Sequence, residues 1–215
     1  SAIAGCVPHG GTLLMARNCH KSVYHAALLG ALHTHYIYPQ PADQMGINGP
    51  IFAEDVEKEL EQHPEVQAVF LTSPTYDGVV SDVRAIAEVV HRKKLPLIVD
   101  EAHGAHFPFS TYFPEDSIKS GADVVIHSVH KTLPSLTQTA LIHLNGNLAD
   151  RQKIRYFLSV YQTSSPSYVL MAGIDQCIEW TAAHQAEFDA FGKRLEVFRN
   201  RIRNLEAIKL LEVPG

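Results

Sequence analysis

The sequence predicts an α/β fold of three layers, in which helices cover both faces of a mostly parallel sheet of about seven strands. Short apolar runs alternate with amphipathic stretches along the chain, which is the pattern of repeated strand–helix units. The apolar runs at 68–71 and 97–99 lack the period-two alternation of a half-exposed strand. They therefore indicate strands that are buried on both faces.

The individual elements follow from local signals. Ser81-Asp82 and Ser165-Pro166 are typical of helix starts, and residues 1–7 have the character of the tail of a helix. Six of the about seven expected strands can be named, and the remaining one is expected to be too weak to locate. Six strands are predicted at 12–16, 34–38, 66–72, 95–100, 123–128 and 139–144. Helices are predicted at 22–31, 53–63, 82–92, 148–159, 166–183 and 184–205.

Composition excludes several classes of protein. The 215 residues are 46% hydrophobic and 19% charged, with a formal net charge of -5, and they contain no basic block for nucleic acid or an anionic membrane. No apolar run reaches the ~18 residues that a membrane span requires. The three cysteines, Cys6, Cys19 and Cys177, are odd in number and lack CxxC spacing. We therefore expect free thiols and a cytoplasmic protein.

Residues 97–104 (LIVDEAHG) combine a buried strand with a carboxylate at its end. Ligands of open α/β sheets bind beyond the carboxyl ends of the strands, so Asp100 is well placed to face one. Pyridoxal 5'-phosphate (PLP) requires such a partner, because an Asp paired with the pyridine nitrogen keeps the ring protonated and electron-withdrawing. The competing interpretation is that Asp100 caps the N-terminus of a following helix.

The same segment admits two further interpretations. Asp-Glu-Ala-His matches the metal-binding box of a helicase class, but that class requires an upstream phosphate loop, GxxxxGK[ST]. The Gly-Lys pair of this chain, Gly192–Lys193, is followed by Arg instead. A metal site made by Asp100, His103 and His106 stays open as an alternative. Its spacing matches no recognised ligand pattern, so we expect no metal.

Residues 124–133 (VVIHSVHKTL) again lead from a buried strand into polar residues. A lysine just past a buried strand can have its pKa lowered, and a neutral amine can attack an aldehyde. Ser128 can donate a hydrogen bond to a phosphate oxygen. Lys131 alone would be taken for an exposed loop lysine. Because Asp100 ends the preceding predicted strand, the sequence favours Lys131 as the residue that forms a Schiff base with PLP.

Four motifs in order along the chain resemble the Orn/Lys/Arg decarboxylases, which are fold-type-I PLP enzymes of the aspartate-aminotransferase superfold. The segment 128–133 (SVHKTL), followed by Thr137-Gln138, resembles the PLP-lysine motif of that family. The segment 17–22 (RNCHKS) resembles the one whose histidine, here His20, stacks on the pyridine ring. The segments 73–78 (SPTYDG) and 163–167 (TSSPS) resemble an active-site loop and a segment near the dimer interface. The resemblance extends from about residue 10 to 200.

This resemblance implies the large PLP-binding domain of an enzyme that decarboxylates arginine, lysine or ornithine to the amine and CO₂, as in polyamine metabolism. Lys131 or His130 would return a proton to the α-carbon, and Tyr76 would line the substrate pocket unless it is packed in the core. Asp77 and Glu101 are candidates for reading a cationic substrate. The implied catalytic residues are Lys131, His20 and His130. The implied PLP-binding residues are Lys131, Asp100, His103, Ser128, His130 and His20.

The resemblance also implies a longer protein. We expect residues 1–215 to be a single domain that lacks the upstream phosphate cup and the C-terminal small domain, and therefore to fold but to bind PLP poorly and to be inactive alone. The whole protein is expected to be a homodimer or higher homo-oligomer, with residues 163–167 near the partner's pocket. Two alternatives remain: another PLP reaction (aldolase, lyase or aminotransferase), or a domain without activity that only assembles with partners.

Overall fold

A computed structural model of the chain describes residues 1–42 and 46–213. Its centre is a six-stranded sheet of order β2-β1-β3-β4-β5-β6. The first five strands of that order pair in parallel, and β6 runs antiparallel to β5 at the edge. The strands are β1 (Thr12–Ala16), β2 (His33–Ile37), β3 (Ala68–Thr72), β4 (Leu97–Asp100), β5 (Val124–His127) and β6 (Leu141–Leu144).

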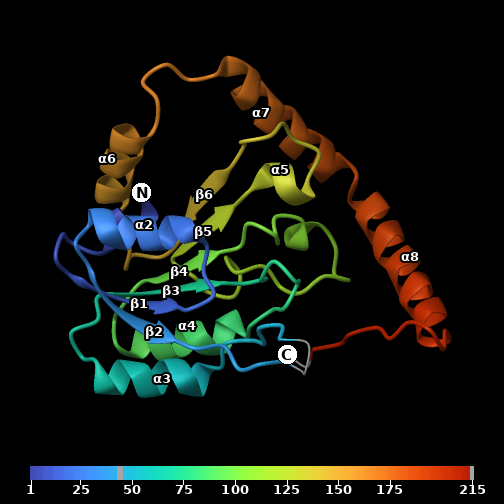
Figure 1. The fold of residues 1–215 in the computed structure, drawn as a ribbon. Coiled ribbons are helices and arrows are strands. Elements are labelled where there is room, and N and C mark those ends of the chain that lie inside the picture. Colours follow the sequence, from blue (N-terminus) through green and yellow to red (C-terminus); the bar gives the residue numbers. More distant parts are fainter. Residues whose placement is uncertain (43–45, 214–215) are drawn as a thin grey trace.

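Helices cover both faces of this sheet (Figure 1). One face carries α1 (Ala2–Cys6), α2 (Lys21–Leu29) and α6 (Arg151–Tyr161), and the other carries α3 (Ala53–Gln62) and α4 (Val83–Arg92). Short helices η1 (Phe107–Phe109) and α5 (Val129–Thr132) lie in the loops that follow β4 and β5. Two long helices, α7 (Tyr168–Ala183) and α8 (Gln185–Arg203), follow α6 and extend away from the layers.

Each central strand contributes side chains to two apolar cores, because successive side chains of a strand point to opposite faces. Leu14 and Ala16 of β1 pack with the side chains of α3 and α4. Leu13 and Met15 pack with those of α1, α2 and α6. All four side chains are fully buried. The strands are therefore covered on both faces, as their uninterrupted apolar runs predict.

The predicted fold class is confirmed, with two differences in detail. The sheet of the described residues has six strands where about seven were expected, and every one of the six overlaps a predicted strand. The helix α5 was not predicted, because four residues are too few to show a helical period. The predicted tail of a helix at 1–7 is α1.

The helices α7 and α8 form the periphery. Side chains of α8 reach the loop after β4, where Phe188 packs on Phe109 and Gly192 lies against the ring of Tyr112. Large apolar side chains of α7, among them Tyr168, Val169 and Met171, are exposed. No helix in the described ranges is long and apolar enough to cross a membrane. All three cysteines are free thiols.

Candidate active site

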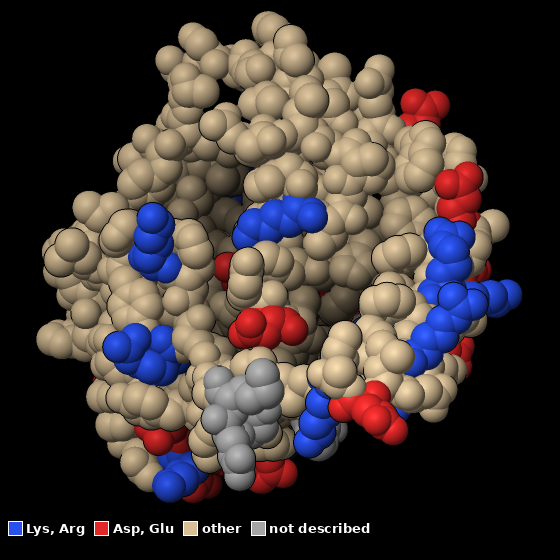
Figure 2. Space-filling view, turned by 45° about the vertical axis from the view of Figure 1, so that its right-hand side comes forward, with Lys and Arg blue, Asp and Glu red and all other residues tan. Residues whose placement is uncertain are grey.

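Three of the four family-like motifs, together with the segment that follows Asp100, meet at one edge of the sheet. Because β1, β3, β4 and β5 are neighbours and parallel, their carboxyl ends lie side by side. The segments that leave these ends are 17–20, 73–78, 101–104 and 128–131. Figure 2 shows a hollow on this side of the molecule, with side chains of both charge signs around it. The topology thus gathers motifs that are more than a hundred residues apart in sequence.

Asp100 ends β4 and faces a cavity of about 300 Å³. The cavity lies between the sheet and the helices α1 and α2, and Ser22, Phe70 and Ile126 also line it. The Asp100 Oδ1 atom accepts the amide N–H of Ala102 at 3.1 Å. Residues 101–106 form turns and no α-helix begins there, so Asp100 is not a helix cap. Its carboxylate is available to a ligand in the cavity.

Lys131 and His103 form a polar pair at the same edge. The Lys131 Nζ atom lies 3.2 Å from His103 Nε2. Burial lowers the pKa of His103, the Lys131 ammonium lowers it further, and the Asp100 carboxylate opposes both. The neutral imidazole is therefore favoured, and its Nε2 accepts a hydrogen bond from the lysine. Lys131 itself is exposed, in the short helix α5.

His130 and Ser128 flank Lys131 in different ways. His130 Nδ1 lies 2.8 Å from the carbonyl oxygen of Thr139. A carbonyl only accepts, so Nδ1 carries the proton and Nε2 is left as an acceptor in the neutral ring. Ser128 occupies the N-cap position of α5 without a side-chain capping bond in the described chain. Its half-buried hydroxyl is thus not consumed by its own helix.

His20 occupies a different setting from that of the Lys131–His103 pair. It is exposed and caps the N-terminus of α2, where its Nδ1 accepts the amide N–H of Ser22 at 3.3 Å and lies 2.9 Å from the Ser22 hydroxyl. The cap lies at the carboxyl end of β1, on the predicted edge. The ring makes no contact with Lys131 among the described interactions.

The loop 73–78 closes on itself and presents Tyr76 at its tip. The Thr75 amide donates to the carbonyl of Val79, and the Val79 amide donates to the Thr75 hydroxyl. Tyr76 is 85% exposed, so it is not a core residue. Its ring lies edge-on to His103 with centroids 5.6 Å apart. Asp77, beside it, is also exposed.

Glu101 does not face the hollow. It is 1% exposed, and its Oε1 accepts the Ser117 amide at 2.9 Å and the Ser117 hydroxyl at 2.6 Å. Its Oε2 lies 2.6 Å from His127 Nε2, and His127 Nδ1 lies 3.1 Å from His143 Nε2. Burial, followed by His127, lowers the pKa of His143. Glu101 is therefore a buried structural acceptor, and the expectation that it reads a substrate is wrong.

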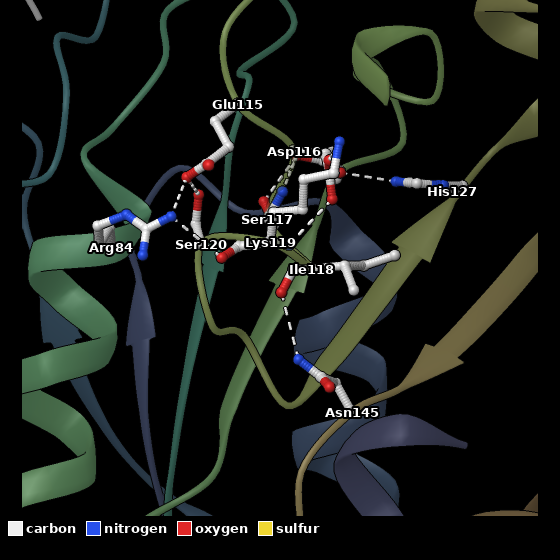
Figure 3. Close-up of polar contacts among 10 residues, drawn as sticks. Arg84, Glu115, Asp116, Ser117, Ile118, Lys119, Ser120, His127 and Asn145 are labelled. Carbon is white, nitrogen blue, oxygen red and sulfur yellow. Dashed lines mark hydrogen bonds and ion pairs between the residues drawn. The ribbon is translucent and has the colours of Figure 1, made fainter. Parts of the chain in front are cut away.

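This buried network, Ser117–Glu101–His127–His143, joins β4, β5 and β6 to the loop 115–120. Figure 3 shows that loop between His127 on one side and Arg84 of α4 on the other. Arg84 pairs with Glu115, and the Ser120 hydroxyl donates to the same Glu115 oxygen at 3.0 Å. No local sequence pattern indicates the network, because its bonded members are separated by 16 to 26 residues. It anchors the backbone next to Asp100.

Three buried polar atoms at the carboxyl edge have no hydrogen-bond partner within the described residues. They are Asn18 Oδ1 after β1, Thr72 Oγ1 at the end of β3 and Thr132 Oγ1 after β5. Thr72 is the register partner of Asp100. Buried polar atoms in proteins are nearly always bonded, so such a group indicates a place for a polar ligand. Lys131 offers an amine and Asp100 a carboxylate at this edge, which fits the aldehyde and the ring nitrogen of PLP.

The alternative metal site is not supported in the described parts of the chain. Asp100, His103 and His106 do not gather into a group with the spacing of metal ligands. The ring of His106 instead packs edge-on against Phe107 and Phe113, with centroids 5.0 and 4.5 Å apart. Burial lowers the pKa of His106 to about 4.

Comparison with known proteins finds a family model that matches nearly the whole chain. Residues 1–214 match the family described as "Orn/Lys/Arg decarboxylase, major domain". The arginine decarboxylase of Bacillus subtilis (strain 168) is 34% identical over 173 residues, which are 80% of this chain and 35% of that protein. An uncharacterized protein of the same organism, YaaO, is 40% identical over 171 residues, which are 79% of this chain and 35% of that protein.

Solved structures share the fold. The constitutive lysine decarboxylase of Escherichia coli superposes with a TM-score of 0.74 over 98% of this chain and 32% of that one, at 24% sequence identity. The chain thus spans about a third of the length of the relatives it matches. The superposition shows that the two chains share the three-layer α/β/α architecture.

Proposed function

Because the chain belongs to the Orn/Lys/Arg decarboxylase family, we propose that it is the PLP-binding part of an enzyme that decarboxylates arginine, lysine or ornithine. The observation that carries the proposal is the meeting of Asp100 with the Lys131–His103 pair at one edge of the sheet, beside unpartnered polar atoms. The relatives named arginine decarboxylase and lysine decarboxylase support a basic amino acid as substrate.

When bound, PLP supplies an electron sink for the pair of electrons left behind by CO₂. Asp100, whose carboxylate lines the cavity beside the sheet, would hold the proton on the ring nitrogen of the cofactor. Lys131 would hold the cofactor covalently, and its amine must first lose a proton to act as a nucleophile. His103 accepts a hydrogen bond from Lys131 Nζ at 3.2 Å, which orients the amine.

The remaining predicted residues take supporting roles. His130 keeps its Nε2 as an acceptor because the Thr139 carbonyl holds the proton on Nδ1. Lys131, or His130 after its Nε2 has taken up a proton, would return a proton to the α-carbon. Ser128 donates to the phosphate. His20, at the N-cap of α2, would stack on the cofactor ring.

The proposal extends to the assembly. We take residues 1–215 to be one domain of a longer cytoplasmic homodimer or larger homo-oligomer, with a phosphate cup and a small domain supplied by other segments. The stretch 163–167 is exposed between α6 and α7, where a partner's pocket can reach it. The amine product would serve polyamine metabolism. The chain's share of about a third of its relatives' length supports a longer protein.

The test is substrate turnover by the full-length enzyme with PLP. The enzyme is given arginine, lysine or ornithine in separate reactions. Two signals are recorded: the release of CO₂ and the visible absorption band of the lysine-bound cofactor. Lys131→Ala should abolish both signals. Lys58→Ala, which changes an exposed lysine of α3, should alter neither. A lysine-dependent band without CO₂ release would point to another PLP reaction, and an unchanged band in Lys131→Ala would refute the assignment.

A further inference from the structure

A cluster of two histidines and two glutamates lies where the edge strand β2 meets the end of α3. His35 belongs to β2, Glu59 to the last turns of α3, and His63 is the C-cap of that helix. Glu65 follows two residues later, before β3. The residues 63–65 lead into the amino end of β3, so the cluster is remote from the carboxyl edge that holds Lys131.

The spacing within this cluster matches metal ligands. The His35 Nε2 atom lies 3.0 Å and the His63 Nδ1 atom 3.5 Å from the same oxygen, Glu65 Oε1. Ligand atoms from all three residues lie within 4.8 Å of one another. In a tetrahedral zinc site with bonds of ~2.0–2.1 Å, neighbouring ligand atoms are separated by roughly 3.3 Å. The two observed distances bracket that separation.

Glu59 lies near the second ring nitrogen of His63, at ion-pair rather than hydrogen-bond distance. Its Oε2 lies 3.7 Å from His63 Nε2, one helical turn away. A histidine ligand typically donates its second ring N–H to a carboxylate, which fixes the tautomer and the orientation of the ring. Here a proton on Nε2 would face Glu59 and leave the Nδ1 lone pair toward Glu65 and His35.

We propose that His35, His63 and Glu65 form a binding site for a divalent transition-metal ion of the zinc type, with water as a fourth ligand. Two imidazole nitrogens exclude a preference for Mg²⁺ or Ca²⁺, which take oxygen ligands. The imidazole rings stack with centroids 3.4 Å apart and an interplanar angle of 17°. One ring must therefore rotate out of the stack as the ion enters, so that both lone pairs point to it.

Such an ion would have a structural role. It would tie β2, an edge strand, to the turn that joins α3 to β3. Edge strands present unpaired backbone groups and are otherwise held on one side only. The inference is independent of the decarboxylase proposal, because none of these residues lies at the carboxyl edge of the sheet.

The test is calorimetric titration of metal-free protein with Zn²⁺ in the absence of added PLP. We expect one equivalent to bind with micromolar affinity. His35→Ala and His63→Ala should each weaken that event at least tenfold, and Glu59→Gln about tenfold, as is usual for an outer contact. The matched control is His25→Ala, an exposed histidine of α2 on the opposite face of the sheet. It should bind as the wild type does.

A second measurement separates loss of ligands from loss of fold. Co²⁺ bound to the wild type should give the visible bands of a tetrahedral ion. His35→Cys, which keeps a ligand at that position, should retain binding and add a sulfur-to-cobalt band in the near ultraviolet. Absence of a stoichiometric event in the wild type, or unchanged affinity in His35→Ala and His63→Ala, would overturn the proposal.

Discussion

Replacing Glu101 by alanine should be among the most destabilising single changes in this chain. The substitution leaves three buried donors without an acceptor: the Ser117 amide, the Ser117 hydroxyl and the His127 Nε2–H. Each buried donor left unsatisfied costs about 1–3 kcal/mol. Water that enters the vacated space recovers part of this, so we expect a loss of about 3–6 kcal/mol. A domain has only about 5–15 kcal/mol of stability in all.

Glu101→Gln should destabilise the protein much less than Glu101→Ala, because the contact between His127 and His143 can adjust to it. Glutamine keeps an acceptor for Ser117 but presents an NH₂ group to His127 Nε2. His127 can respond by moving its proton to Nδ1, if His143 moves its own proton from Nε2 to Nδ1. The present 3.1 Å contact then reverses its direction, with His127 Nδ1–H donating to His143 Nε2. The cost is then mainly the difference between charge-assisted and neutral hydrogen bonds, about 1–2 kcal/mol.

The assay is urea unfolding followed by pulse proteolysis, which reports the globally unfolded fraction. Glu61→Ala, an exposed carboxylate of α3, is the matched control and should stay within about 0.5 kcal/mol of the wild type. The reasoning is refuted if Glu101→Ala loses less than about 1 kcal/mol, or if the glutamine variant is as unstable as the alanine variant.

Three further outcomes are expected. Gly5→Ala should lower the urea midpoint, because its new Cβ would lie 2.3 Å from Ile154 Cγ1 and 2.9 Å from the Ile154 backbone; overpacking of this kind costs about 1–3 kcal/mol. Burial lowers the pKa of His106 to about 4. Between pH 4 and pH ~6.5, His106 is therefore protonated more in the unfolded state than in the folded state. The free energy of unfolding should therefore fall as the pH drops through this window, by about 1–2 kcal/mol after solvent screening, and His106→Asn should flatten the dependence. Burial raises the pKa of Cys6 to about 12 and of Cys19 to about 11, so both thiols should react with a disulfide reagent at pH 8 more than about 100-fold slower than in urea.

Much of the fold is predictable from local sequence. Burial of a strand on both faces leaves an uninterrupted apolar run, as at 68–71 and 97–99, and both runs lie in observed strands. The edge strands β2 and β6 are only partly buried, and each of them also overlaps a predicted strand. The order of the strands is a different matter, because β1 pairs with both β2 and β3 and no local signal states this. The short helix α5 escaped because it contains a single turn.

The residues of the site also differ in whether a local sequence signal predicts them. Asp100 and Lys131 could be proposed because each ends or follows a buried run, which is a local property. The Glu101 network and the His35–His63–Glu65 cluster depend on partners 16 to 30 residues apart, which only the packed sheet brings together. His20 shows a third case, in which a side chain caps its own helix. Histidine has no strong cap preference that would have predicted it.

Because α7 and α8 are exposed at the periphery, different parts of this chain should open to solvent with different free energies. Amide hydrogens of the sheet should exchange with solvent only on global unfolding, whereas those of the peripheral helices should exchange by local fraying at a far smaller free energy. The one tryptophan, Trp180, belongs to α7, where it is 42% exposed and stacks on His184. Its fluorescence should therefore report the fraying of α7, and it should not report changes at the sheet edge that holds Lys131.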